Sequence, residues 1–314
     1  MNDKLKLIVA FLKDFCNNPV DGLKRACDII LHGATKTQRI GREWLFMRDK
    51  ILSWPQAERR KFVDEVAVLK DTAMLNAFLY ARVRTGSNAT SGYDKAEGLP
   101  FVVHNGNRLY YTKSTYDAYS AYVYGVDVEG ILGSGCLVKS PHSYVDKHHF
   151  VEDGDVVLDI GCAEALFALD SIDKASKVYL FECDKKWFKP LNATFGKFGD
   201  KVVFVRKLVS DKTSDDSIAL EDAIHEPDDA TFFMKMDIEG WEQTVIKASE
   251  KFLRAHKIKL SCCTYHRQED AEVISKMLES YGFEVRFSEG YMLPCMNGIH
   301  YPYFRKGVIY ARNY

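Results

Sequence analysis

The strongest indication of the fold is the segment from Val156 to Asp184. It reads Val156-Val-Leu-Asp-Ile-Gly161-Cys-Ala-Glu164-Ala-Leu-Phe-Ala-Leu169, followed by Val178-Tyr-Leu-Phe-Glu182-Cys-Asp184. The apolar run ending in Asp159-Ile-Gly161 predicts a buried parallel strand, and residues 165–172 predict the helix after it. A second strand over 177–181 ends at Glu182. This is the start of a Rossmann-like βαβ unit, in which a glycine turn seats a nucleotide and an acid about 20 residues later binds the ribose hydroxyls.

The first loop indicates which nucleotide fits. A dinucleotide site needs Gly-x-Gly-x-x-Gly, because its later glycines allow close approach to the pyrophosphate and close helix packing. Here only Gly161 is present, with Cys162, Ala163 and Ala165 in the rest of the loop, and no P-loop Lys-Ser/Thr follows. A phosphate-free nucleoside is therefore expected, of which S-adenosylmethionine (SAM) is the common one. An NAD-dependent oxidoreductase is the least favoured of the hypotheses.

Composition describes an ordinary globular protein. The 314 residues are 46% apolar and 28% charged, enough for one large or two modest domains. The 43 basic and 44 acidic residues balance, so no nucleic-acid partner is indicated. The sequence has no apolar run of about 18 residues, so no membrane span is predicted. The eight cysteines show neither Cys-x-x-Cys nor zinc-type histidine spacing, which favours buried thiols and a cytoplasmic location.

The chain is expected to have three parts. Residues 1–98 predict a helical N-terminal domain and a Gly/Ser-rich linker, with packing or homodimer formation as its role. Residues 99–150 predict a β-rich segment that caps the substrate side, with a hairpin at Asn105-Gly106. In residues 151–314 strand and helix patterns alternate, which is typical of an α/β nucleotide-binding domain.

Further buried strands are predicted over 201–205, 232–236 and 258–263. In an open α/β sheet a ligand lies beyond the carboxyl ends of the parallel strands. The residues expected at these ends, and so expected to gather at one edge of the sheet, are Asp159, Gly161, Glu182, Asp211, Asp237 and His266.

Several motifs together resemble the FkbM-type family of SAM-dependent methyltransferases over roughly residues 150–290. The most specific is Lys235-Met-Asp237-Ile-Glu239-Gly240-Trp-Glu242. The others are Asp159-Ile-Gly161, Phe181-Glu182 and Val209-Ser-Asp211-Lys212. The chain departs from the family pattern at Ala163 and Ala165, where asparagine and a second glycine are usual. The resemblance implies a class I methyltransferase sheet with helices on both faces and SAM as the cofactor.

The cofactor-binding roles follow from the chemistry of each side chain. Glu182 has two acceptor oxygens for the two ribose hydroxyls. Asp159 or Glu164 is expected to meet the ammonium group of SAM, although Asp159 has the alternative role of tying down the turn. Ser210 and Asp211 are expected to border the adenine. Asp237 is expected at the same end of the site.

Methyl transfer to a hydroxyl requires removal of a proton. His266 is the expected general base and Asp237 its orienting partner. Alternatively Asp237 and Glu239, with His266, hold a divalent metal ion that acidifies the hydroxyl. The metal-free form is preferred because no third carboxylate stands at ligand spacing, so no metal ligand is predicted. A structural, hydrogen-bonded His266 stays open as a further alternative.

The leading hypothesis is a SAM-dependent O-methyltransferase that acts on a hydroxyl of a small molecule or glycan and yields S-adenosylhomocysteine (SAH). The alternative is a catalytically inactive, methyltransferase-like binding or scaffold protein, in which Ala165 has weakened the binding of the cofactor.

Overall fold

The computed structural model describes residues 45–70, 89–115, 118–127, 140–294 and 301–314. The chain divides into two compact units. The first comprises Met1–Leu79 and Leu293–Tyr303, and the second Tyr80–Met292 and Phe304–Tyr314. Much of the predicted N-terminal helical domain, including the helices expected to form a homodimer, lies outside the described residues.

The described part of the first unit is helical, as predicted. Residues 45–52 form a helix, and α4 (Gln56–Arg59), the 3₁₀ turn η1 (Arg60–Phe62) and α5 (Val63–Lys70) follow. Trp54 stacks on Tyr303 with ring centroids 6.2 Å apart and meets Tyr301 edge-on at 5.5 Å. Aromatic packing of this kind supplies much of the buried area of a small helical unit.

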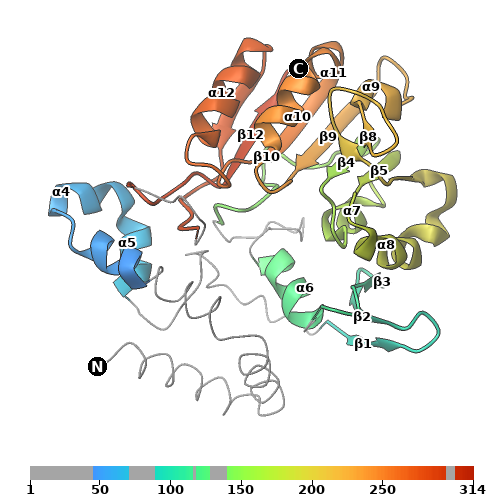
Figure 1. The fold of residues 1–314 in the computed structure, drawn as a ribbon, viewed down its shortest axis with the longest axis horizontal. Coiled ribbons are helices and arrows are strands. Elements are labelled where there is room, and N and C mark those ends of the chain that lie inside the picture. Colours follow the sequence, from blue (N-terminus) through green and yellow to red (C-terminus); the bar gives the residue numbers. More distant parts are fainter. Residues whose placement is uncertain (1–44, 71–88, 116–117, 128–139, 295–300) are drawn as a thin grey trace. The chain divides into compact units, whose positions relative to one another are not determined.

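The second unit is built on a seven-stranded sheet in the order β11-β12-β10-β9-β4-β5-β6 (Figure 1). Strands β4, β5, β6, β9 and β10 run parallel, whereas β12 runs antiparallel to both of its neighbours. The sheet confirms the predicted Rossmann-like α/β fold. The strand bounds are β4 (Val156–Ile160), β5 (Lys177–Phe181), β6 (Val202–Val205), β9 (Thr231–Met236), β10 (Lys257–Cys263), β11 (Glu284–Phe287) and β12 (Val308–Arg312).

Helices cover this sheet. All five residues of β4 are buried, as expected of a strand with both faces covered. Helices α10 and α12 pack on each other, and α12 also packs on β11 and β12 (Figure 1). Among the described residues, no helix has the length and apolar character needed to cross a bilayer. The elements between the strands are α7 (Leu166–Ser171), η2 (Lys185–Trp187), α8 (Phe188–Phe195), η3 (Gly196–Lys201), β7 (Leu208–Val209), β8 (Ser217–Ile218), α9 (Leu220–Ala223), α10 (Glu242–Ala248), α11 (Glu250–Ala255) and α12 (Asp270–Ser280).

A three-stranded antiparallel sheet precedes the main sheet in the chain. It contains β1 (Ser91–Asp94), β2 (Leu99–His104) and β3 (Asn107–Tyr110). Asn105 and Gly106 have φ values of 47° and 75°, so they form the tight hairpin turn that the sequence predicted. His104 joins this sheet to its surroundings, because its Nε2 lies 2.9 Å from Asp170 of α7 and its Nδ1 lies 3.0 Å from Tyr122 of α6 (Ala118–Asp127).

Residues 140–150, here named the crossing segment, are hydrogen-bonded to the β10 and β12 side of the sheet. Ser261 of β10 donates a hydrogen bond to the Tyr144 carbonyl at 2.6 Å, and Tyr310 of β12 donates one to the Ser143 carbonyl at 2.7 Å. Arg286 of β11 forms two hydrogen bonds to Asp146, at 2.6 and 2.8 Å. The crossing segment thereby brings side chains from the chain before β4 to the sheet.

Candidate functional site

The loop after β4 lies very close to the end of β9. Gly161 has a φ of 75°, and a Cβ atom added to it would lie 2.1 Å from the Asp237 carbonyl oxygen. No side chain fits such a gap, so glycine is required here by space as well as by conformation. The contact fixes the Asp159-Ile-Gly161 turn against the Asp237 turn.

Two alanines of this loop also adopt left-handed backbone conformations. Ala163 has a φ of 49° and Ala165 a φ of 62°. This conformation costs an ordinary residue about 1–2 kcal/mol, which glycine avoids. At both positions the loop therefore has a backbone conformation that glycine adopts more readily than alanine.

Glu182 follows β5 and lies beside this loop. Its Oε2 accepts a hydrogen bond from the Ala163 amide at 3.0 Å, and its Oε1 accepts one from the Asp184 amide at 2.7 Å. The side chain is half-buried. Each carboxylate oxygen has further acceptor capacity, so the group is oriented and can still bind a diol. Its role with ribose stays a prediction.

Asp159 faces the interior of the protein. The residue is 1% exposed, and its Oδ1 lies 3.1 Å from Lys235 Nζ. Lys235 also donates a hydrogen bond to the Gly161 carbonyl at 2.8 Å. Burial raises the pKa of Asp159, although the Lys235 charge opposes the shift. This geometry suits a carboxylate that ties down the turn; contact with an ammonium group stays a prediction.

The other predicted cofactor residues lie at or near the surface. Glu164 is half-buried, and desolvation raises its pKa to about 6. Ser210 donates a hydrogen bond to the exposed Asp211 at 3.1 Å, in the loop after β7. Among the described contacts, none joins this pair to Glu182, so their place beside an adenine stays a prediction.

The end of β10 carries His266 into a cluster of carboxylates. Its Nδ1 lies 2.9 Å from Glu242 Oε1, whereas its Nε2 lies 3.5 Å from Asp237 Oδ1 and 3.7 Å from Glu239 Oε2. Arg305 donates hydrogen bonds to the carbonyls of Tyr265 and His266. The structure thus brings the three predicted catalytic residues together. Glu242 is the nearest carboxylate to the ring and is placed to orient it, a role that the sequence argument gave to Asp237.

The ionisation of His266 reflects this setting. Burial alone would lower its pKa, but the Glu242 carboxylate 2.9 Å from Nδ1 and the charges of Asp237 and Glu239 outweigh burial, so the pKa is raised. Glu242 is fully buried and also accepts a hydrogen bond from the Ile238 amide at 3.0 Å. Glu239 is different, because 86% of its side chain is exposed. Glu242 and Asp237 are thus the inner partners of the ring.

Two residues of the crossing segment reach Asp237 from its other side. Tyr144 donates a hydrogen bond to Asp237 Oδ2 at 2.7 Å, and His142 Nε2 lies 3.4 Å from the same oxygen. Burial opposes ionisation of Asp237, but the interactions with His142, Lys235 and His266 outweigh it and hold its pKa well below the usual range. Sequence reasoning missed His142 and Tyr144, because no local pattern links them to a turn more than ninety residues later.

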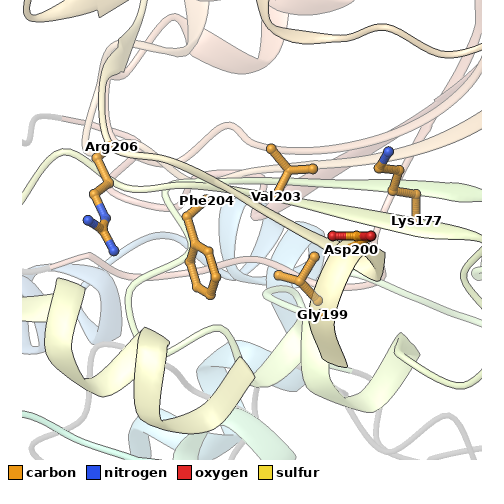
Figure 2. A pocket seen from close by; sticks show the side chains of 7 residues that line it. Lys177, Gly199, Asp200, Val203, Phe204 and Arg206 are labelled. Carbon is orange, nitrogen blue, oxygen red and sulfur yellow. The ribbon is translucent and has the colours of Figure 1, made fainter. Parts of the chain in front are cut away.

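The structure also has a hollow along the edge strand β6, with a volume of about 790 Å³ (Figure 2). It is lined by Lys177, Gly199, Asp200, Val202, Val203, Phe204 and Arg206. None of these residues belongs to the predicted site. The arrangement around Gly161, Glu182, Asp237 and His266 is therefore the better functional candidate, since it joins chemically active groups at the carboxyl ends of parallel strands.

The sheet order, with its single antiparallel strand β12, and the Gly161 turn after β4 define a Rossmann-like domain of the methyltransferase class. Residues 151–285 match the family described as the methyltransferase FkbM domain, which confirms the resemblance found in the sequence. The match covers less than half of the chain, and over it the sequence is similar to FkbM-type methyltransferases. No curated protein matches the chain.

Solved structures of methyltransferases are also similar to this chain. Methyltransferase FkbM from Methylobacillus flagellatus KT is 21% identical over 51% of this chain and 44% of that chain, with a TM-score of 0.40. Precorrin-6y C5,15-methyltransferase from Geobacter metallireducens GS-15 is 16% identical over 52% of this chain and 81% of that chain, with a TM-score of 0.35. A candidate methyltransferase from Streptococcus mutans, in complex with SAH, is 14% identical over 52% of this chain and 91% of that chain, with a TM-score of 0.36. This chain thus spans less than half of the Methylobacillus protein.

Proposed function

We propose that the protein is a SAM-dependent O-methyltransferase whose acceptor is a hydroxyl group of a small molecule or glycan. The observation that carries the proposal is the meeting of a close glycine turn, an oriented carboxylate and a histidine with two carboxylate partners at one edge of the sheet. The family match for residues 151–285 supports the methyltransferase class. The choice of a hydroxyl acceptor depends on His266.

The residues around Gly161 fit a phosphate-free nucleoside. Glu182 is held by two backbone amides and retains acceptor capacity for the ribose hydroxyls. Glu164, half-buried beside the loop, is the available carboxylate for the ammonium group of SAM. Ser210 and Asp211 would border the adenine. SAM, when bound, supplies an electrophilic methyl group.

His266 is the proposed base. Glu242 faces Nδ1 at 2.9 Å, which fixes the ring and leaves Nε2 as the atom that accepts the hydroxyl proton. Nε2 faces Asp237, whose carboxylate stabilises the imidazolium after proton transfer. Because in-line methyl transfer depends mainly on alignment in a dry site, the buried histidine and carboxylates suit this reaction.

Native mass spectrometry of the full chain, followed by an assay for consumption of SAM with candidate sugars and hydroxylated small molecules, tests the proposal. We expect a bound species with the mass of SAM or SAH, and methyl transfer to at least one acceptor. His266→Ala should lower turnover by about 100-fold or more while leaving SAM binding intact. Bound NAD, or turnover that survives loss of His266, would contradict the proposal.

A second candidate is a methyltransferase-like binding or scaffold protein without activity. The left-handed Ala165 favours it, because its methyl group stands where the family's second glycine would leave room for a cofactor. In that case SAM and SAH should fail to bind at any accessible concentration. Changing Ala165→Gly should then restore binding if its methyl group is the obstacle.

The proposal keeps the cytoplasmic location expected from the sequence. The described cysteines 162, 183, 262 and 263 are all free thiols, which suits a reducing compartment. The expected partner is the small-molecule or glycan acceptor; a homodimer through the N-terminal helices remains part of the proposal.

A further inference from the structure

We propose that His142, Asp237 and Cys263 form a binding site for a divalent transition-metal ion, with Zn²⁺ as the natural class of occupant. The inference goes beyond methyl transfer and stands whether or not the chain is active. The site also differs from the alternative metal site expected from the sequence, which consists of Asp237, Glu239 and His266. Only Asp237 is common to both sets.

The spacing of the three side chains matches a shared ion. His142 Nε2 lies 3.4 Å from Asp237 Oδ2 and 3.6 Å from Cys263 Sγ, and all three atoms lie within 4.8 Å of one another. Around a tetrahedral Zn²⁺, bond lengths of about 2.1 Å to N or O and about 2.3 Å to S separate N and O by about 3.4 Å and N and S by about 3.6 Å. The observed N···O separation is longer than a good hydrogen bond.

These groups also converge on one atom. Asp237 Oδ2, Cys263 Sγ and the Tyr144 hydroxyl, which is 3.3 Å away, all surround Nε2 of His142. A single ring nitrogen forms one strong hydrogen bond, so three heteroatoms around it are more than hydrogen bonding requires. An ion placed among them would contact a nitrogen, an oxygen and a sulfur atom at once.

A second group of possible ligands, formed by Asp237, Glu242 and His266, is a weaker candidate. There, His266 Nδ1 lies 2.9 Å from Glu242 Oε1, which is a hydrogen-bond distance. That contact is already explained by an orienting carboxylate. In the His142 group, by contrast, Nε2 has three contacts of 3.3–3.6 Å and none as short as 2.9 Å.

The three ligands come from segments that strand pairing and hydrogen bonds hold in place. Met236 and Cys262 are partners in the β9–β10 ladder, so Asp237 and Cys263 stand next to each other beyond that pair. His142 comes from the crossing segment, which is fastened to β10 and β12. His142 and Cys263 are both buried, at 2% and 0% exposure. A preformed, buried set of ligands loses little conformational freedom when an ion binds.

The chemistry of the ligands selects the ion. Imidazole with thiolate favours Zn²⁺ over Mg²⁺ or Ca²⁺, which prefer oxygen ligands. Binding would form a metal–sulfur bond and release the Cys263 thiol proton to solvent, with no change of oxidation state. Tyr144 would support the site from outside, because it donates a hydrogen bond to the ligating carboxylate. Three protein ligands leave a fourth position open.

Metal content and cobalt spectroscopy test the site without reference to activity. The full chain, stripped with a chelator and equilibrated with Zn²⁺, should retain one Zn²⁺ per chain after gel filtration. With Co²⁺ it should show a sulfur-to-cobalt charge-transfer band and the intense visible bands of tetrahedral cobalt. Cys263→Ser should abolish the charge-transfer band, and Tyr144→Phe should weaken Zn²⁺ binding by about 10- to 100-fold.

The neighbouring cysteine provides a matched control. Cys262 is equally buried, but its Sγ contacts the Cys263 carbonyl and lies outside the cluster. Cys262→Ser should therefore keep both the metal and the spectrum. His142→Asn gives an independent route if Cys263→Ser does not fold. Wild-type protein that binds no Zn²⁺, or a cobalt spectrum unchanged by Cys263→Ser and His142→Asn, would overturn the proposal and leave a hydrogen-bonded network.

Discussion

At the scale of single residues, Gly161 has the most demanding position in the site. A Cβ atom there would lie 2.1 Å from the Asp237 carbonyl oxygen and 2.8 Å from Ile238 Cγ2. Gly161→Ala is thus expected to lower the free energy of unfolding by about 3 kcal/mol or more, because a clash is added to backbone strain. Urea denaturation of the purified variant measures the change.

Gly154→Ala is the matched control for this substitution. Gly154 also has a positive φ, of 92°, but no atom lies within 4 Å of its added Cβ. Only backbone strain remains there, so the expected loss is about 1 kcal/mol. Equal losses in the two variants would mean that the close approach of the two turns is not a strong constraint.

Glu242 was part of the motif found in the sequence, but its position beside His266 was not predicted. We expect Glu242→Gln to lower kcat by about 10- to 100-fold, since the His266 ring would lose its charged orienting partner while the base itself remains. Steady-state kinetics with SAM, together with SAM titration calorimetry, separates turnover from binding.

Glu250→Gln serves as the control for Glu242→Gln, because Glu250 forms an exposed ion pair with Arg254, at 45% exposure of each side chain. Its kinetics should match those of the wild type. A normal kcat in Glu242→Gln would show that His266 needs no help from Glu242.

At the scale of elements, the buried pair Asp159–Lys235 joins β4 to β9. Asp159→Asn is expected to reduce the free energy of unfolding by about 3–5 kcal/mol, because it removes the buried carboxylate charge that lies 3.1 Å from the Lys235 ammonium. Glu272→Gln, which removes a pair exposed at 70% and 72%, should change the stability by less than about 0.5 kcal/mol. Similar small losses in both would argue that Asp159 has little structural role and would leave it free for a ligand.

The crossing segment provides a test by pH. His149 stacks on Tyr310 of β12, and burial lowers its pKa to about 3. Below about pH 6.5, His149 is protonated in the unfolded chain but stays neutral in the folded chain. The free energy of unfolding should therefore fall by a few kcal/mol as the pH drops from 6.5 toward 3. Urea denaturation across this range should show that His149→Gln flattens the fall.

His148→Gln is the natural control for His149→Gln, since His148 is the adjacent residue and is exposed. Its pH profile of stability should follow the wild type. A steep acid loss that persists in His149→Gln would assign the proton uptake to other groups.

The strands were predicted from the sequence more completely than the tertiary contacts were. Continuous apolar runs such as Val156–Ile160 and Lys177–Phe181 identified the parallel strands, because buried strands need apolar side chains on both faces. The order of strands β10 and β12 is less visible, since an antiparallel insertion leaves no local pattern. Tertiary contacts of the crossing segment were not predictable for the same reason.

At the scale of the whole molecule, the sheet collects side chains that the chain keeps far apart. Parallel strands place Glu182, Asp237 and His266 at the same edge, which is why these three candidate site residues could be named from sequence. Tyr144 reaches Asp237 across 93 residues, and only the folded crossing segment reveals it. The chemistry of this edge belongs to the second compact unit, which is formed by Tyr80–Met292 and Phe304–Tyr314.

Binding of SAM by the turn at Gly161 and the carboxylate of Glu182 is the main element of the proposed function. Titration calorimetry of the full chain with SAM tests it most directly, with Glu182→Ala compared against Asp184→Asn, an exposed carboxylate two residues away. We predict that the wild type and Asp184→Asn bind SAM with similar affinity and that Glu182→Ala loses at least about 10-fold, the equivalent of about 1.4 kcal/mol. Unchanged affinity in Glu182→Ala would contradict the claim.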